Sequence, residues 1–348
     1  MRIAQLTSNY HKVSPTSTHA LYSLAAALVN GLTDLGNEVT LFASGDSESK
    51  GKLYSVTPTS IYTQPEEIKR NYMMLLISKC FENAKNFDVI HSHFTLMSSF
   101  FANFAPVPTL ISVHSPIEDR LKPFLSLYNK NNYVSFSLAQ RKQMPELNWV
   151  ANIYHGVDTK VFTFNDAPKD YFFYLGRITE EKGVHLAIEA AKAAGVSLII
   201  AGTSYQQEGY WHEKIEKNID GNMVRYIGEA NQETKIEYLR NAKGLLFPTQ
   251  YDEVFGLVMI EAMACGTPVI AWNKGSVPEV IQDKHTGFVV DSVDKMVQAI
   301  KNIDKISRQA CRERAERYFS IEKMVQGYER VYLRIIEDHR KKMMAKQK

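Results

Sequence analysis

The sequence predicts an α/β protein made of two Rossmann-like, doubly wound domains that face each other across a cleft. Three observations carry this prediction. The chain has 348 residues, and domains average about 150 residues. Short runs rich in β-branched and aromatic residues alternate with stretches of helical periodicity, which is the pattern of parallel sheets covered on both faces. The alternation stops in an aperiodic segment and restarts near Tyr171.

The first series of elements occupies residues 1–155 and is expected to form the Rossmann-like N-terminal domain. Helices are expected between most of its strands, notably at 18–35 and 66–86. Expected strands lie at 2–7, 38–43, 88–91, 109–114, 133–137 and 149–154.

The second series occupies residues 156–322 and is expected to form the Rossmann-like C-terminal domain. Its expected strands are 171–175, 197–201, 224–227, 244–248, 268–271 and 287–290. Its expected helices are 183–194, 231–241, 256–265 and 277–282. Apolar residues at spacings of three and four over 321–344 predict a long terminal helix with one apolar face. We assign 323–348 to a C-terminal helical segment that packs back towards the N-terminal domain.

Composition limits the classes of function. The balance of 41 basic and 38 acidic side chains gives a formal charge of +3, too even for a nucleic-acid-binding surface. Three widely spaced cysteines fit neither a zinc site nor a disulfide framework, so a reducing compartment is expected. The start of the chain turns polar by Ser8, unlike an export signal. We therefore expect a cytoplasmic protein, and the basic tail leaves peripheral contact with the inner membrane face as an alternative.

The segment 249–271 follows an expected strand, turns at Phe255 and Gly256, and opens a helix. The unpaired amides of Phe255, Gly256 and Leu257 at the helix start would point at an anion. Glu253 precedes the helix and Glu261 lies within it, so each carboxylate would accept hydrogen bonds from a different hydroxyl-bearing part of a ligand. The alternative is structural, with Glu253 as a helix cap and Glu261 as a solvated residue.

Two cations occupy the turn after the expected strand 171–175. Arg177 offers a rigid fork of donors and Lys182 a compact ammonium, a combination suited to a diphosphate whose charge grows as a bond to it breaks. The alternative is a surface loop in which these cations pair with Glu180 and Glu181.

Histidines follow two neighbouring strands of the first series. His114 comes at the tip of the strand that starts at Thr109, where residues lining a cleft should lie. His91 and His93 resemble a metal pair, but neither a third ligand nor an Asp-x-Asp motif accompanies them. We therefore expect no metal and no resident cofactor.

These motifs resemble the retaining glycosyltransferases of family 4, which have the GT-B fold. The family signature is a Glu, seven residues and a second Glu, with Phe-Gly following the first, and this chain has EVFGLVMIE at 253–261. The downstream runs EAMACGTPVIA, GSVPEVI and TGFVV are similar as well. The resemblance is dense from about Asn148 to Val290.

The resemblance implies that residues 1–155 form the acceptor-side domain and residues 156–322 the nucleotide-sugar donor domain. It also implies a role for each candidate residue. Arg177 and Lys182 would bind the donor pyrophosphate, and Glu253 would contact hydroxyls of the donor sugar. The amides of Phe255, Gly256 and Leu257 would contact sugar or phosphate, and Glu261 would hold the ribose. His114 would line the reaction centre. The expected reaction is transfer of a hexose from a nucleotide sugar, expected to be a UDP-sugar, to a small-molecule, glycan or lipid acceptor, with retention and without metal.

One departure from the family pattern concerns the loop after the first strand. Family members usually carry a Gly-Gly pair there, whereas this loop contains no glycine. Ser14, Thr16, Ser17 and Thr18 would have to supply hydroxyls and a helix N-cap instead. Two other functions therefore stay open: a GT-B nucleotide-sugar 2-epimerase, and a nucleotide-sugar-binding protein without catalytic activity.

Overall fold

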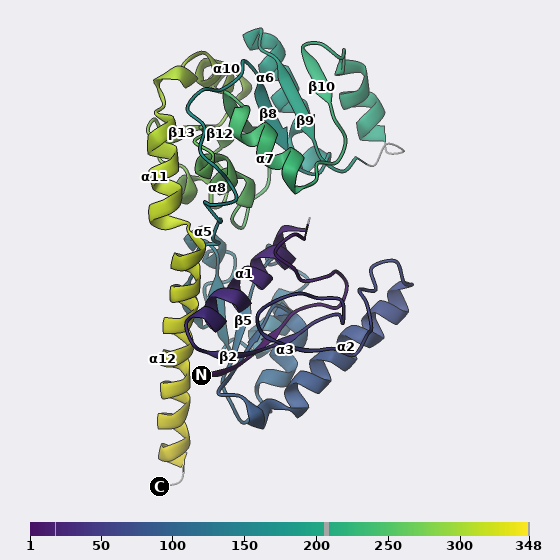
Figure 1. The fold of residues 1–348 in the computed structure, drawn as a ribbon, viewed down its shortest axis with the longest axis vertical. Helices are drawn as coiled ribbons and strands as arrows, with labels where there is room; N and C mark the ends of the chain where they lie inside the picture. Colours follow the sequence, from purple (N-terminus) through teal and green to yellow (C-terminus); the bar gives the residue numbers. More distant parts are fainter. Residues whose placement is uncertain (18, 205–208, 347–348) are drawn as a thin grey trace. The chain divides into compact units, whose positions relative to one another are not determined.

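The computed structural model describes residues 1–17, 19–204 and 209–346. The chain forms two compact units. The first comprises Met1–His155 together with Ile321–Lys348, and the second comprises Gly156–Ser320. The first unit is therefore built from two separate parts of the sequence, and each unit is described by itself (Figure 1).

The first unit contains one fully parallel sheet with the strand order β3-β2-β1-β4-β5-β6-β7. Its strands are β1 (Arg2–Leu6), β2 (Glu38–Phe42), β3 (Lys52–Tyr54), β4 (Val89–Ser92), β5 (Thr109–Ser112), β6 (Asn132–Ser135) and β7 (Trp149–Asn152). The order reverses direction between β1 and β4, which makes this pair the topological switch point of the sheet.

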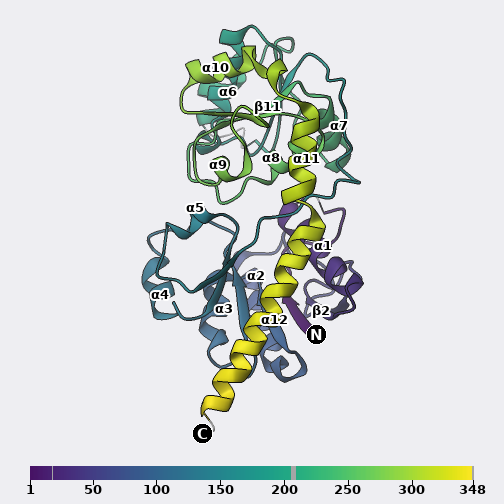
Figure 2. The same ribbon diagram turned by 90° about the vertical axis from the view of Figure 1, so that its left-hand side faces the viewer.

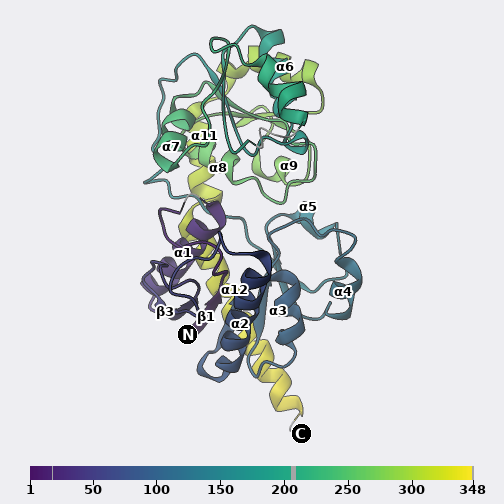
Figure 3. The same ribbon diagram turned by 90° about the vertical axis from the view of Figure 1, so that its right-hand side faces the viewer.

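Helices cover both faces of this sheet. Its helices are α1 (Ala20–Asp34), α2 (Glu66–Glu82), η1 (Ala84–Asn86), α3 (Thr95–Ala102), α4 (Lys122–Leu127), α5 (Leu138–Arg141) and α12 (Ile321–Lys346). Residues of α1 and α12, such as Val29 and Tyr332, share one apolar core with Ile3 and Leu41 of the sheet. Helices α2, α3 and α4 pack on the opposite face (Figure 3). Both faces are buried, as parallel strands require.

The second unit contains a parallel sheet with the order β10-β9-β8-β11-β12-β13. Its switch point lies between β8 and β11. The strands are β8 (Phe172–Leu175), β9 (Leu198–Ala201), β10 (Val224–Tyr226), β11 (Gly244–Phe247), β12 (Val269–Trp272) and β13 (Gly287–Val290).

The helices of the second unit form two groups. One group contains α6 and α10, which pack against each other, and the other contains α7, α8 and α11, with α8 contacting both of its neighbours (Figure 2). The helices are η2 (Glu180–Lys182), α6 (Val184–Ala194), η3 (Trp211–Ile215), η4 (Glu216–Asn218), α7 (Gln232–Asn241), α8 (Leu257–Ala264), α9 (Val277–Val280), α10 (Val293–Lys301), η5 (Ile303–Lys305) and α11 (Arg308–Tyr318).

All the expected strands are present, with ends that shift by a few residues, and the expectation of an α/β fold with two parallel sheets is confirmed. The second unit ends at Ser320, slightly before the boundary we placed at 322. Sequence analysis did not include β3, α3, α4, α5, α10 and α11. Strand β3 has three residues at the sheet edge and no fully buried side chain, so it lacks an apolar signal.

The sequence did not predict helix α11 for a different reason. Its buried apolar side chains are only Cys311 and Ala315, so it has no apolar stripe. Arginines attach it instead. Arg312 donates to the carbonyls of Phe162 and Ala264 at 2.7 Å each, and Arg308 donates to three backbone carbonyls of the same unit.

No helix in the described parts of the chain is long and apolar enough to cross a membrane.

Close packing joins α1 to α12 within the first unit. A Cβ added to Gly31 of α1 would lie 2.5 Å from Cγ2 of Val325 on α12, well inside van der Waals contact. On α12 itself, a Cβ added to Gly327 would lie 3.4 Å from its nearest neighbour, Cγ2 of Ile153, which is ordinary contact. Only the first glycine is therefore required by the packing of the two helices.

We expect Gly31→Ala to destabilise the protein by about 1 kcal/mol, because overpacking against a stiff Val outweighs the gain in helix propensity. Gly327→Ala serves as the matched control and should stabilise it by about 0.5–1 kcal/mol. Urea unfolding of both variants measures the difference. Equal effects of the two substitutions would contradict the packing described for Gly31.

Candidate functional site

Ligands of open parallel sheets bind beyond the carboxyl ends of the strands at the switch point. In the second unit these are the ends of β8 and β11. The loop after β8 carries Arg177 and Lys182, and the loop after β11 carries Glu253. The topology therefore places three of the predicted site residues at the switch point of this sheet.

Lys182, Tyr251 and Glu253 form one cluster. The Lys182 Nζ lies 2.8 Å from Oε2 of Glu253, and the Tyr251 hydroxyl donates to the same oxygen at 2.7 Å. The ammonium also donates to the Tyr251 hydroxyl and lies 4.7 Å from the centre of its ring. The Lys182 and Glu253 side chains are only 17% and 13% exposed, so this ion pair is shielded from water.

Tyr251 is a proton donor in this cluster. Burial, and then the negative charge of Glu253, raise the pKa of its hydroxyl far above the usual value near 10. The hydroxyl therefore keeps its proton and orders the carboxylate. Sequence analysis missed Tyr251. Its place two residues before Glu253, in the same loop, is the signal that could have identified it.

Hydrogen bonds hold the two loops together. Gln250 donates through its backbone N–H to the carbonyl of Glu181 and through its side-chain amide to the carbonyl of Glu180, each at 2.8 Å. The Ser276 N–H donates to the Glu253 carbonyl at 2.9 Å. These bonds fix the backbone around Lys182 and Glu253, so the cluster depends little on side-chain flexibility.

Arg177 lies apart from this cluster in the structure. Its guanidinium pairs with Glu181 at 3.2 Å, and the two side chains are 57% and 53% exposed. This is the surface ion pair considered as the alternative for Arg177, and such a pair contributes little to stability. Lys182, in contrast, pairs with neither Glu180 nor Glu181 among the described contacts.

Glu261 is held by a separate cation. Lys235 of α7 lies 2.6 Å from Oε1 of Glu261, with side chains that are 20% and 12% exposed. The same ammonium lies 5.1 Å from the ring centre of Phe162. Glu261 is therefore not the solvated helix residue of the alternative interpretation. Nothing in the spacing of the sequence indicated Lys235.

The start of α8 is shaped by Gly256, which has a positive φ of 77° and carries no side-chain cap. Glu253 does not cap this helix, because no side-chain hydrogen bond to its first turn is found among the described contacts. The Phe255 side chain is buried, and its backbone carbonyl accepts from the Ser276 hydroxyl at 2.9 Å. The first-turn amides of α8 lie directly after the Glu253 loop.

In the first unit, histidines gather at the carboxyl ends of β4 and β5. His93 Nδ1 lies 2.8 Å from His114 Nε2, and their rings stack with centroids 5.0 Å apart. The His114 ring also stacks near His155 at 6.0 Å. Buried His91 bonds to Ser112 and to Tyr332 of α12, each at 2.7 Å. His114 thus belongs to a hydrogen-bonded histidine cluster.

Burial lowers the pKa of each of these histidines. The pKa of His93 falls to about 4 and that of His155 to about 3, and those of His91 and His114 lie well below 6.5. All four rings are therefore neutral near pH 7. Among the described residues, no group of three or more His, Cys, Asp or Glu side chains is arranged to hold a metal ion.

The loop after β1 differs from our expectation of a hydroxyl cap. His19 is the N-cap of α1 and makes no side-chain capping bond. Ser14 and Thr16 bond to each other at 3.1 Å instead, and Thr18 lies outside the described residues. Asn9 in this loop is fully buried, and neither polar atom of its side chain has a partner in the described structure.

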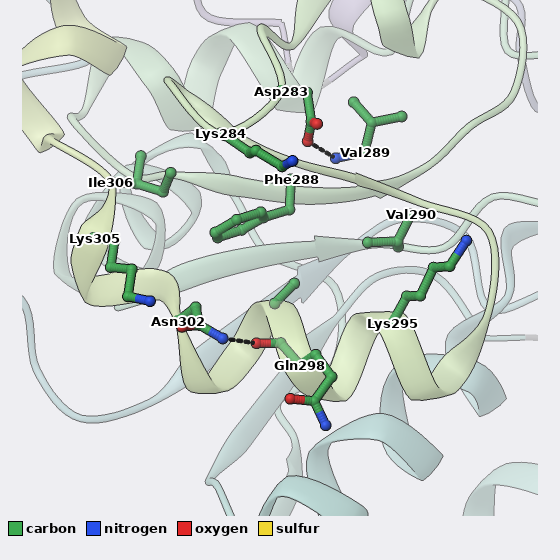
Figure 4. Close-up of a pocket in the computed structure, with 11 residues that line it drawn as sticks. Asp283, Lys284, Phe288, Val289, Val290, Lys295, Gln298, Asn302, Lys305 and Ile306 are labelled. Carbon is green, nitrogen blue, oxygen red and sulfur yellow. Dashed lines mark hydrogen bonds between the residues drawn. The ribbon is translucent and has the colours of Figure 1, made fainter.

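A pocket of about 430 Å³ lies elsewhere in the second unit, at β13, α10 and η5. Phe288 forms its apolar floor, and Lys284 and Lys305 stand at its rim (Figure 4). Strand β13 is an edge strand that β12 separates from β11. None of the predicted site residues lines this pocket.

Solved structures with the same fold identify the class of protein. The chain is similar to AviGT4, a glycosyltransferase involved in avilamycin A biosynthesis, with a TM-score of 0.74, 21% identity, and coverage of 97% of this chain and 98% of that one. It is also similar to HepE of Anabaena in complex with UDP and glucose, with a TM-score of 0.69, 17% identity, and coverage of 94% and 97%. The two parallel-sheet domains therefore have the GT-B fold.

Sequence comparison gives the family. The model for glycosyl transferases group 1 matches residues 159–318, and the model for glycosyltransferase family 4 matches residues 23–163. An uncharacterized glycosyltransferase of Methanocaldococcus jannaschii is 25% identical over 282 residues, which are 74% of this chain and 78% of that protein. The chain belongs to the family 4 glycosyltransferases and is an enzyme that transfers a sugar.

The lowered pKa values of the histidine cluster predict a pH-dependent stability. In the unfolded chain these rings take up protons near pH 6.5, whereas the folded state resists protonation until well below that value. The stability they contribute is therefore complete above about pH 6.5 and is lost as the pH falls towards about 4.

We expect the midpoint of thermal unfolding to fall by at least ~3 °C between about pH 7.5 and about pH 5. His91→Gln should reduce this fall, because it removes one of the buried titrating rings. His285→Gln, at an exposed position, is the control and should leave it unchanged. Equal pH dependence in the wild type and His91→Gln would contradict this account.

Proposed function

We propose that this enzyme transfers a hexose from a UDP-sugar to an acceptor hydroxyl with retention of anomeric configuration, without a metal ion. The observation that carries the proposal is the shielded cluster of Lys182, Tyr251 and Glu253 at the switch point of the second sheet. A cation and a carboxylate side by side suit the two halves of a nucleotide sugar, the anionic diphosphate and the hydroxyl-rich ring.

Lys182 would change partners when the donor binds. In the structure its ammonium is neutralised by Glu253 and the Tyr251 hydroxyl. A diphosphate brings more negative charge than one carboxylate and would attract the ammonium away from Glu253. The freed carboxylate, still bonded to Tyr251, could then accept hydrogen bonds from the sugar. The ion pair thus keeps both groups in place before the donor arrives.

Arg177 would supply a second positive charge to the leaving diphosphate. It lies in the same loop as Lys182, and its exposed partner Glu181 holds it only weakly. Exchanging that partner for phosphate oxygens would cost little. The amides of Phe255, Gly256 and Leu257 at the start of α8 would add uncharged donors for the same anion.

Glu261 would bind the ribose hydroxyls. The neighbouring Lys235 orients this carboxylate through a contact of 2.6 Å, and a carboxylate has enough lone pairs to accept two hydroxyl hydrogen bonds as well. His114 of the first unit would contact the transferring sugar or the acceptor. Its neutral ring can accept a hydrogen bond from a hydroxyl, whereas a protonated ring could not.

Three considerations support the finer details. The structure of HepE, which has the same fold, contains UDP and glucose, and this favours a UDP-sugar as donor. Two cations and a helix start can neutralise a diphosphate, a task that metal ions perform in other transferases. The described site offers no carboxylate in an obvious position for a covalent intermediate, so we assign the acceptor proton to the leaving phosphate.

The cation roles are tested by substitution. We expect Lys182→Ala to slow sugar transfer roughly 100-fold or more and Arg177→Ala roughly 10- to 100-fold, because each removes charge that stabilises the leaving diphosphate. Lys295→Ala is the control, since Lys295 forms an exposed ion pair with Asp291 that resembles the pair of Arg177 with Glu181. Near-normal rates in both site variants would refute the proposed clamp.

Donor choice is tested by thermal shift. UDP-sugars should raise the unfolding temperature more than GDP- or ADP-sugars, because only a ligand that binds the folded state stabilises it. The shift should persist in EDTA and should shrink in Glu261→Ala, which removes the proposed ribose contact. A larger shift with GDP- or ADP-sugars would replace UDP as the donor nucleotide, and loss of the shift in EDTA would contradict metal-independent binding.

The 2-epimerase alternative predicts a different outcome with the donor alone. An epimerase would convert a UDP-sugar to its epimer without an acceptor, whereas a transferase should leave it unchanged apart from slow hydrolysis. Incubation with UDP-sugar followed by chromatography separates the two activities.

A further inference from the structure

Gln5 and Tyr332 connect through hydrogen bonds to the histidine pair of the first unit. We propose that Gln5 of β1 and Tyr332 of α12 hold His114 as the tautomer with its hydrogen on Nε2, so that Nδ1 presents a lone pair to a substrate hydroxyl. This inference rests on the function proposed above for His114. It assigns to the C-terminal helix a positioning role in the reaction.

A chain of hydrogen bonds runs through the first unit from Tyr332 to His114. The amide of Gln5 donates to the Tyr332 hydroxyl at 2.8 Å, and its oxygen lies 3.3 Å from His93 Nε2. His93 Nδ1 in turn lies 2.8 Å from His114 Nε2. On the other side, the Tyr332 hydroxyl lies 2.7 Å from His91 Nδ1. Gln5 therefore joins the helix hydroxyl to the His93–His114 pair.

The direction of each bond follows from the hydrogens available. An amide oxygen only accepts, so His93 must carry its hydrogen on Nε2 to bond Gln5. A neutral imidazole has one ring hydrogen, which leaves His93 Nδ1 as an acceptor. His114 must then donate from Nε2, and its own Nδ1 carries the lone pair.

The Tyr332 hydroxyl fixes the direction of the bonds on the His91 side of the chain. It accepts from Gln5, so its hydrogen is directed to His91 Nδ1. His91 then donates from Nε2 to Ser112, at 2.7 Å. Every ring in the chain thereby carries its hydrogen on Nε2, which is the more stable tautomer of a neutral histidine side chain. Rotating the Gln5 amide by half a turn would reverse every bond and would place all three rings in the less stable form.

The network is uncharged, which preserves these directions. The titratable groups that face His114 are His91 and His93 after β4, His155 after β7, and the tyrosines of α12 behind them. Burial lowers the pKa of the histidines and raises that of Tyr332, so all stay neutral near pH 7. A protonated His93 would donate from both nitrogens, so His114 would have to accept at Nε2 and carry its own hydrogen on Nδ1.

Tyr328 provides a matched control on the same helix. It lies one turn before Tyr332, is equally buried, and its hydroxyl lies 3.3 Å from Ser112. Tyr328 is therefore the last residue of the series Tyr332, His91, Ser112, Tyr328, and it does not contact Gln5 through a described hydrogen bond. Tyr332→Phe and Tyr328→Phe each remove one buried hydroxyl from one network, but only the first frees the Gln5 amide to rotate.

The tautomer can be observed directly by NMR of protein labelled with ¹⁵N in histidine, because couplings to the ring carbon-bound protons show which nitrogen carries the hydrogen. The His114 signals are identified by their loss in His114→Gln. We expect the Nε2–H form in the wild type and in Tyr328→Phe, and a mixture of both tautomers in Tyr332→Phe. An Nδ1–H form in the wild type, or an unchanged His114 in Tyr332→Phe, would overturn the proposal.

Kinetics provide the second measurement. We expect Tyr332→Phe to lower kcat for sugar transfer by about 3- to 10-fold with KM changed by less than about twofold. The reason is that His114 would carry its hydrogen on Nδ1 in part of the molecules and could not accept a hydrogen bond there. Tyr328→Phe should retain kcat within about twofold of the wild type. Equal losses in the two variants would contradict the positioning role. Failure of the Lys182→Ala test would instead refute the proposed function and would leave the tautomer measurement valid.

Discussion

The constraint on which this structure depends is the common direction of the strands within each sheet. Both faces of each sheet are covered by helices, so the carboxyl edge is where polar side chains can meet a ligand. At the switch point of the second sheet, the loops after β8 and β11 are neighbours, and hydrogen bonds from Gln250 join them. This arrangement brings Lys182 within 2.8 Å of Glu253, although 71 positions separate them in the chain. The proposed donor site of the second unit depends on this proximity of Lys182 and Glu253.

Exposure distinguishes the two cations of the same loop. Arg177 forms an ion pair that water screens, and a pair of this kind neither holds a loop nor resists exchange. Lys182 forms its pair in a shielded position, where removing either partner leaves a charge without compensation. Tyr251 reduces that cost by donating to the carboxylate. The loop is therefore organised around Lys182, and Arg177 is free to follow an incoming anion.

Much of the fold could be predicted from the sequence, because buried parallel strands are short apolar runs and helices such as α6 and α7 have clear periodicity and ends. The motif around Glu253 indicated the family, which the comparisons confirm. The partners of the site residues could not be predicted. Tyr251 and Lys235 meet their carboxylates through side-chain directions that spacing does not encode. Helix α11 was missed because arginines attach it through backbone carbonyls.

The first unit is completed by a helix that is synthesised after the whole second unit. Helix α12 supplies Tyr328, Tyr332 and Ile335 to the core that also contains α1, yet the whole second unit is synthesised between the two. During translation the apolar face of α1 stays uncovered until α12 is made, whereas the second unit can fold before that. The histidine cluster therefore cannot be completed until α12 has been synthesised, and a nascent chain that still lacks α12 exposes apolar surface that chaperones bind.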